Sequence, residues 1–188
     1  MTLLSIIQLP FSHLKRWKHI QQRHPSIATL AWCVVLPMSL LPPVLIYYAA
    51  THYGDSFAPG FADRQWRFIT TILFLAELLT FFLMGWLIHA VVNSNRELSM
   101  SYHDAYLVAA LAPLPLWFAT IALLVPSLLF NAMVVMVALG TSCSLVYHGL
   151  QALCERSTND VTTMSVTYTV MAAGLLAWGL LMAIVWAY

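Results

Sequence analysis

Five apolar segments, each long enough to cross a lipid bilayer as a helix, are the feature that most constrains this chain of 188 residues. A helix rises about 1.5 Å per residue, so about 20 apolar residues are needed to cross the hydrocarbon core. The segments cover residues 26–48, 66–92, 105–125, 127–150 and 164–187. Because lipid cannot satisfy backbone polar groups, the pattern predicts an all-α, polytopic membrane protein with five transmembrane helices.

The composition agrees with a membrane environment and argues against several function classes. Hydrophobic residues make up 61% of the chain and charged residues only 8%, whereas a soluble domain carries about 25% charged residues. With a net charge of +1, the chain has no basic field that would attract nucleic acid. Its three cysteines, Cys33, Cys143 and Cys154, lack metal-binding or redox spacing, and we expect them to pack as small apolar side chains.

The lysines and arginines outside the apolar segments predict the orientation. With five spans, one side of the membrane receives Lys15, Arg16, Lys18, Arg23, Arg96 and Arg156, and the other receives Arg64 and Arg67. Because basic residues concentrate in cytoplasmic loops, we expect a cytoplasmic N-terminus and a periplasmic or extracellular C-terminus. The chain then divides into a basic, amphipathic cytoplasmic segment, 1–25, and a five-helix transmembrane domain, 26–188.

The N-terminal segment alternates apolar and basic residues at helical spacing. The apolar positions are Phe11, Leu14, Trp17 and Ile20, and the basic ones among them are Lys15, Arg16 and Lys18. This pattern is typical of a helix that lies in the membrane surface. It also fits a basic tether that holds the first span to anionic headgroups, and the sequence leaves both interpretations open.

Single residues locate several helix starts and breaks. Ser101 to Asp104 has the serine-x-x-acid spacing of a capping box, and Ser157 to Asp160 repeats it. Prolines remove a backbone donor and bend a helix, so we expect breaks in the first and third spans. The prolines concerned are Pro37, Pro42, Pro43, Pro113 and Pro115, while Pro126 predicts a tight hairpin between the third and fourth spans.

Glu77 lies deep in the second apolar segment, within the run LFLAELLTFFLMGW. A carboxylate at that depth is costly and therefore needs an explanation. It is either functional, as a proton or ion carrier or a substrate contact, or a neutral acid hydrogen-bonded to a neighbouring helix. An isolated carboxylate makes a poor relay, which favours the structural interpretation. The Ser142 and Ser144 hydroxyls are candidate partners.

Four further titratable residues fall near the predicted cytoplasmic ends of the spans: His89, His103, Asp104 and His148. A zinc site requires three or four converging ligands, and no HxxxH or HxxE pair supports one. We therefore expect interfacial side chains and no metal, cofactor or catalytic residue. An enzyme acting on a lipid would instead need these groups within hydrogen-bonding reach of one another in a pocket.

Small residues recur at four-residue spacing in the last two spans. They are Gly140 and Ser144 in the fourth span, and Ala173, Ala177, Gly179, Ala183 and Ala187 in the fifth. Such rows let helix backbones approach closely. They predict tight packing within the chain or, as the other possibility, a face for self-association.

Four stretches and the five-span layout together resemble the Yip family of Rab-GTPase-interacting membrane proteins, in its bacterial, YohC-like inner-membrane branch. The stretches are IIQLPFSHLKRW, SYHDAYLVAALAPLPLWF, SLVYHGLQAL and the terminal VWAY. The resemblance implies a location in the cell inner (plasma) membrane and no known enzymatic activity. Eukaryotic members resemble scaffolds that contact small GTPases through a longer N-terminal region, often with a D-L-Y-G-P motif. This sequence lacks that motif, so we do not expect GTPase binding.

The sequence contains no G-x-S-x-G, H-E-x-x-H, P-loop or Rossmann fingerprint, and we therefore expect no enzyme. It predicts a non-catalytic, membrane-organising scaffold that binds membrane lipids or protein partners, self-association included. The alternative is a small transporter or channel that uses intramembrane Glu77 and the proline-kinked helices.

Overall fold

The computed structural model describes residues 15–22, 25–56, 59–94, 98–154 and 160–186. Within these ranges every regular element is a helix, which confirms the predicted all-α fold. Five helices are long and apolar enough to cross a membrane, as the sequence predicts.

The helices follow one another along the chain as five spans. A short helix, α2 (Lys15–Gln21), precedes the first span, which consists of α3 (Ile27–Leu30), a π-helical turn (Ala31–Val35), α4 (Leu36–Ser39), α5 (Leu41–Tyr53) and a 3₁₀ turn (Gly54–Ser56). The second span is one continuous helix, α6 (Trp66–Ser94). The third is α7 (Tyr102–Leu111), α8 (Leu114–Ala119) and a 3₁₀ turn (Thr120–Leu124). The fourth and fifth are α9 (Leu128–Leu153) and α10 (Asp160–Trp186).

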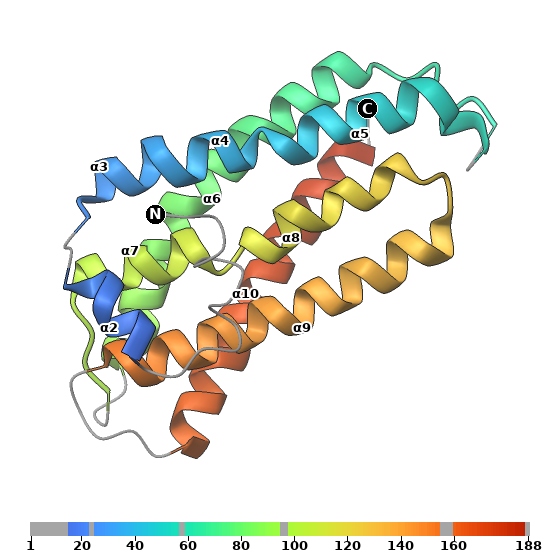
Figure 1. The fold of residues 1–188 in the computed structure, drawn as a ribbon. Helices are drawn as coiled ribbons and strands as arrows, with labels where there is room; N and C mark the ends of the chain where they lie inside the picture. The colour runs from blue at the N-terminus through green and yellow to red at the C-terminus, as the bar shows by residue number, and fades with distance from the viewer. Residues whose placement is uncertain (1–14, 23–24, 57–58, 95–97, 155–159, 187–188) are drawn as a thin grey trace.

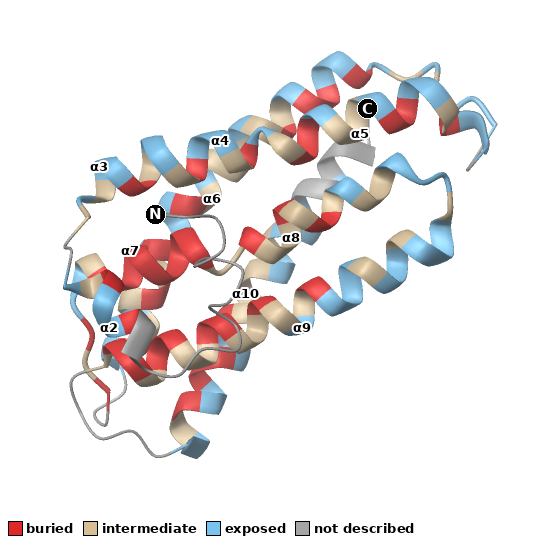
Figure 2. Cartoon of the chain, viewed as in Figure 1, coloured by how far each residue is buried: buried red, intermediate tan, exposed pale blue. Residues whose placement is uncertain are grey.

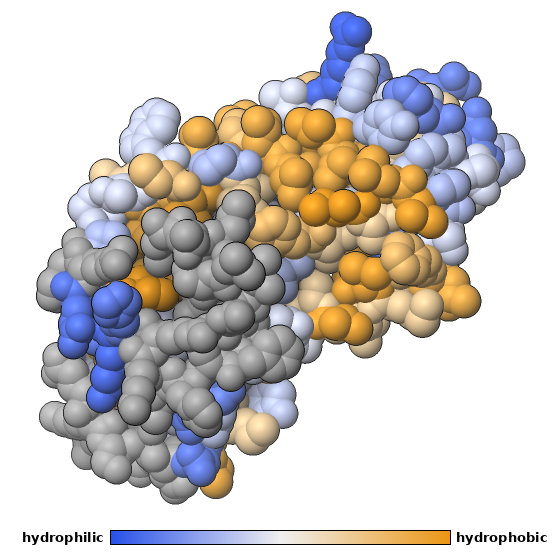
Figure 3. All heavy atoms as spheres, in the orientation of Figure 1, coloured by the Kyte–Doolittle hydropathy of each residue, from blue (hydrophilic) through white to orange (hydrophobic). Residues whose placement is uncertain are grey.

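Successive spans run in opposite directions, which gives the bundle two ends (Figure 1). The α2 end carries α2, the start of α7 and the end of α9. The hairpin end carries the connection from α5 to α6 and the turn at 125–127, where Pro126 joins the third and fourth spans as predicted. Figure 3 shows a band of apolar surface between polar atoms at the two ends, as a helical bundle in a bilayer requires.

The predicted proline breaks are confirmed in both spans. Before Pro37 the helix widens into a π-helical turn, in which the Leu36 N–H donates to the carbonyl of Ala31. The wider turn relieves the clash between the proline ring and the preceding turn of the helix. In the third span, α7 ends at Leu111 and the helix resumes at Leu114, just after Pro113.

The best-buried part of the molecule lies at the α2 end (Figure 2). Its centre is α7, in which every residue from Asp104 to Leu111 is buried, enclosed by α6, α9 and the first span. The hairpin end has only a small separate cluster formed by Ala50, Trp66 and Ile69. The helices are therefore held together chiefly at one end of the bundle.

Helix α2 packs on the bundle, which differs from both interpretations of the N-terminal segment. Trp17 is 0% exposed, and Ile20 is also buried, while Lys18 and His19 face outward. A Cβ placed on Gly149 of α9 would lie only 3.1 Å from the Trp17 ring. The apolar face of α2 thus covers protein and not lipid, because a glycine leaves room for the indole. Phe11 and Leu14 lie outside the described residues.

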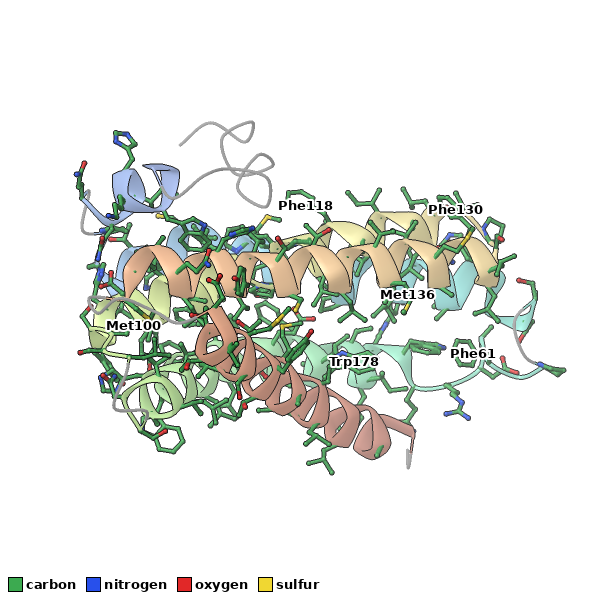
Figure 4. The ribbon with its side chains drawn as sticks, turned by 90° about the horizontal axis from the view of Figure 1, so that it is seen from below. Phe61, Met100, Phe118, Phe130, Met136 and Trp178 are labelled. Carbon is green, nitrogen blue, oxygen red and sulfur yellow. The ribbon has the colours of Figure 1, made fainter. Side chains whose placement is uncertain are left out.

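The small residues of the last two spans meet little of the chain itself. A Cβ on Gly140 or on Gly179 would have no neighbour within 4 Å, and one on Gly174 would meet only the Met84 side chain. Helix α10 packs on α6 and α9 near the α2 end and then diverges from α9 toward the hairpin end (Figure 4). The close approach in this fold is made instead at Gly85, where a Cβ would lie 2.7 Å from the Tyr106 ring.

Candidate functional site

Asp104 is the centre of a hydrogen-bonded group at the α2 end. Its backbone N–H donates to Ser101 Oγ at 3.1 Å, and Ser101 Oγ donates to Asp104 Oδ2 at 2.7 Å, which confirms the predicted cap. Gln21 of α2 donates from Nε2 to the same carboxylate oxygen at 3.0 Å. The positive end of the α7 dipole also favours the buried carboxylate. Asp104 therefore joins α2 to α7. The second predicted cap begins at Ser157, outside the described residues.

His103, beside it, joins α7 to the segment that follows α2. Its Nε2 lies 2.5 Å from the carbonyl oxygen of Pro25, so Nε2 carries the proton in this contact. Its Nδ1 lies 3.9 Å from Asp104 Oδ1. The pair thus holds the start of the first span against the start of the third.

The structure does not bring His89 or His148 to this pair. His89 contacts the Tyr102 ring edge to face, at 5.3 Å between centroids, and His148 contacts Tyr147 in the same manner at 5.4 Å. Among the described residues, no three His, Cys, Asp or Glu side chains are placed to hold a metal ion. The four interfacial residues therefore divide into one bonded pair and two separate ring contacts.

Cys154 lies next to the Asp104 group, just beyond the end of α9. Burial, and secondarily the charge of Asp104, raises the pKa of its thiol to about 11. The side chain therefore remains a neutral thiol at physiological pH. It is a poor nucleophile, since the thiolate is the reactive form.

Asn93 and two tyrosines stabilise the connection between the second and third spans. Asn93 Nδ2 donates to the Met100 carbonyl at 3.0 Å, and the Met100 N–H donates to Asn93 Oδ1 at 3.2 Å. Tyr106 donates its hydroxyl hydrogen to the Phe82 carbonyl at 3.0 Å and accepts from the Tyr102 hydroxyl at 3.1 Å. Each contact ties α6 to the chain that follows it.

Glu77 is partly buried on α6 and faces the third span. The Trp117 side chain of α8 lies within hydrogen-bonding reach of its carboxyl group. The second carboxyl oxygen, Oε2, is buried and has no partner among the described atoms. The neighbouring helix thus supplies an indole, which the spacing of the sequence does not reveal because Trp117 follows the proline break.

Ser142, a hydroxyl suggested by the sequence as a partner of Glu77, has another role. Its Oγ donates to the Ala112 carbonyl at 2.6 Å, at the point where α7 ends before Pro113. A carbonyl freed at a proline break in a membrane helix needs a donor from another helix. Ser142 therefore satisfies the break in the third span.

A hollow of about 410 Å³ opens at the hairpin end, between the end of α5 and the start of α6. It is lined by Tyr47, Thr51, Arg64, Gln65, Trp66, Arg67 and Phe68. The sequence analysis used Arg64 and Arg67 only to orient the chain and missed this site. The one signal for it is the alternation of basic and aromatic residues in RQWRF.

Comparison with known proteins gives one match. A family model described as the Yip1 domain matches residues 7–181, which include nearly all of the chain's five spans. The curated proteins and the solved structures provide no match.

Proposed function

Because the chain belongs to the Yip family and is a multi-pass membrane protein, we propose that it acts as a non-catalytic scaffold that organises lipid or protein partners. The observation that carries this proposal is an uncovered apolar surface, the α9–α10 face. It consists of Leu128, Leu129, Met133, Met136 and Val137 of α9 with Leu176, Trp178 and Leu180 of α10. These side chains cover the hairpin halves of two diverging helices.

Two glycines suit this face to the close approach of another helix. Gly140 and Gly179 leave open space where a side chain would be. In lipid, helices associate by close packing at such small residues and not by a hydrophobic driving force. By contrast, several polar side chains described above are occupied in joining helices of the same chain: those of Gln21, Asn93, Asp104, Tyr106 and Ser142. The surface, and not an internal polar site, is thus the part suited to partners.

A photo-crosslinking side chain at Val137 tests this function in native membranes. Val137 is 71% exposed, and Leu79 of α6, which is 68% exposed, serves as the matched control. We expect a discrete protein adduct, with a partner or a second copy, from position 137 only. The adduct should disappear in Gly140→Leu, because the larger side chain prevents close helix approach. Identical lipid-only products at both positions would contradict the proposal.

We place the protein in the inner (plasma) membrane with the α2 end in the cytoplasm. The support is the distribution of basic residues, since Arg64 and Arg67 are the only lysines or arginines between Arg23 and Arg96. The α2 end should consequently be open to a protease only from the cytoplasmic side of sealed vesicles. Cleavage there by a protease confined to the opposite side would reverse this orientation.

The second candidate function is a small transporter or channel, favoured by the partnerless Oε2 of Glu77. A carrier of this kind would show a pH-dependent flux in proteoliposomes that Glu77→Gln abolishes, because glutamine cannot release a proton. The scaffold function predicts no flux from either protein. A flux in the wild type that is lost in the variant would therefore favour the transporter over the scaffold.

A further inference from the structure

The hollow at the hairpin end combines positive charge with aromatic walls. Arg64 and Arg67 line it together with Tyr47, Trp66 and Phe68. The Arg64 guanidinium lies over the Phe61 ring, 5.9 Å from its centroid. Within the described part of the chain, no carboxylate or hydrogen-bond acceptor occupies the exposed guanidinium of Arg67. The site thus offers a cationic group that is available to an external anion.

The backbone adds to the attraction for an anion. Helix α6 begins at Trp66 and runs for 29 residues, so its N-terminal end faces the hollow. The unpaired N–H groups and the dipole of a helix start favour negative charge. Phosphate is the anion that an arginine fork binds best, through two parallel hydrogen bonds.

The position of the hollow indicates where such a phosphate comes from. Both candidate spans that form it, Ile27–Ser56 and Trp66–Ser94, have one end here. Tryptophan and tyrosine gather at the level of the lipid headgroups, where the phosphates of a bilayer lie. The surface of the same two helices continues into the apolar band with exposed Val44, Phe68 and Leu75. Acyl chains can lie along this surface, whereas a free phosphate ion would make no use of it.

We propose that the Arg64–Arg67 hollow binds the phosphate of a phospholipid headgroup, with a preference for an anionic lipid over a zwitterionic one. The guanidinium groups hold the phosphate oxygens, Gln65 offers an amide donor, and the aromatic rings flank the glycerol backbone. The second positive charge disfavours the cationic end of a zwitterionic headgroup. The site rests on the proposed function only in requiring a bilayer, and it lies apart from the α9–α10 face.

The test measures lipid selectivity of the full chain in phosphatidylcholine bilayers that contain a trace of spin-labelled phosphatidylglycerol or spin-labelled phosphatidylcholine. Wild type should immobilise the anionic lipid preferentially. Arg67→Gln should lower that preference about fivefold, and Arg64→Gln with Arg67→Gln should lower it roughly twentyfold, as expected for about 1 kcal/mol per arginine near an anionic surface. Lys18→Gln, which removes one exposed charge at the α2 end, should leave the measured preference unchanged.

Further arms keep the result decisive. Arg67→Lys should keep more of the preference than Arg67→Gln, and inorganic phosphate should not displace the labelled lipid. Thermal unfolding should be the same for wild type and the surface variants. Full retention of lipid preference in the double variant would overturn the proposal, and so would displacement by inorganic phosphate, which would identify a free anion as the occupant. Cross-linking at Val137 should be unaffected, so this proposal and the scaffold function can fail separately.

Discussion

Trp17→Ala should release helix α2 from the bundle. Trp17 is fully buried and fills the space left by Gly149, so its removal deletes most of the apolar contact of a helix of only seven residues. Truncating a buried aromatic side chain typically costs about 3–5 kcal/mol. A helix this short is unstable alone, and the loss therefore falls on α2 more than on the five spans. We expect undocking and local unfolding, with the spans intact.

Limited trypsin digestion of sealed vesicles measures this release, through cleavage after Lys18. The helix must open before the protease can bind, so the cleavage rate follows the opening equilibrium. It should rise at least about a hundredfold in Trp17→Ala, and only when trypsin is on the cytoplasmic side. Trp32→Ala is the matched control, because Trp32 is 70% exposed on the first span. Equal rates in wild type and Trp17→Ala would show that this contact does not hold α2.

Gly85→Ala should destabilise the transmembrane bundle itself. The added Cβ would lie 2.7 Å from three atoms of the Tyr106 ring, a separation at which the ring or the helix must move. The ring cannot move freely, because it packs edge to face on Phe81 and its hydroxyl donates to the Phe82 carbonyl. Overpacking of this kind costs about 1–3 kcal/mol. The change should thus lower the free energy of unfolding despite the better helix propensity of alanine.

Gly140→Ala provides the opposite expectation for the same chemical change. A Cβ at Gly140 meets nothing within 4 Å, so only the gain in helix propensity, up to about 1 kcal/mol, remains. Unfolding by a denaturing detergent, followed by circular dichroism, should show a lower midpoint for Gly85→Ala and an equal or higher midpoint for Gly140→Ala. The same midpoint shift in both variants would mean that the α6–α7 contact is not as close as described.

The candidate site was predictable where local chemistry decides and not where helices meet. The cap at Ser101 and Asp104 follows from a spacing of three residues, and it is present. By contrast, the sequence suggested hydroxyls of α9 as partners of Glu77, whereas Trp117 faces it and Ser142 serves the break at Ala112. Partners that belong to different helices depend on the rotation of each helix, which no short spacing specifies.

The glycines illustrate the same limit. The rows of small residues in the fourth and fifth spans suggested close packing, yet Gly140 and Gly179 lie in open space. Gly85 and Gly149, which stand in no such row, are the positions where another side chain comes closest. Small residues permit close approach, but the surrounding shape decides which of them are used.

The sequence by itself determined that the chain crosses a membrane five times as helices and that prolines break the first and third spans. Those features follow from the polarity of long segments and from the missing backbone donor of proline, both of which act locally. Only the tertiary structure decided that α2 docks on Gly149, that Trp117 faces Glu77, and that Arg64 and Arg67 share one hollow with residues of α5. The reason is physical: these contacts depend on how the helices rotate and cross, which is set by the packing of all of them together.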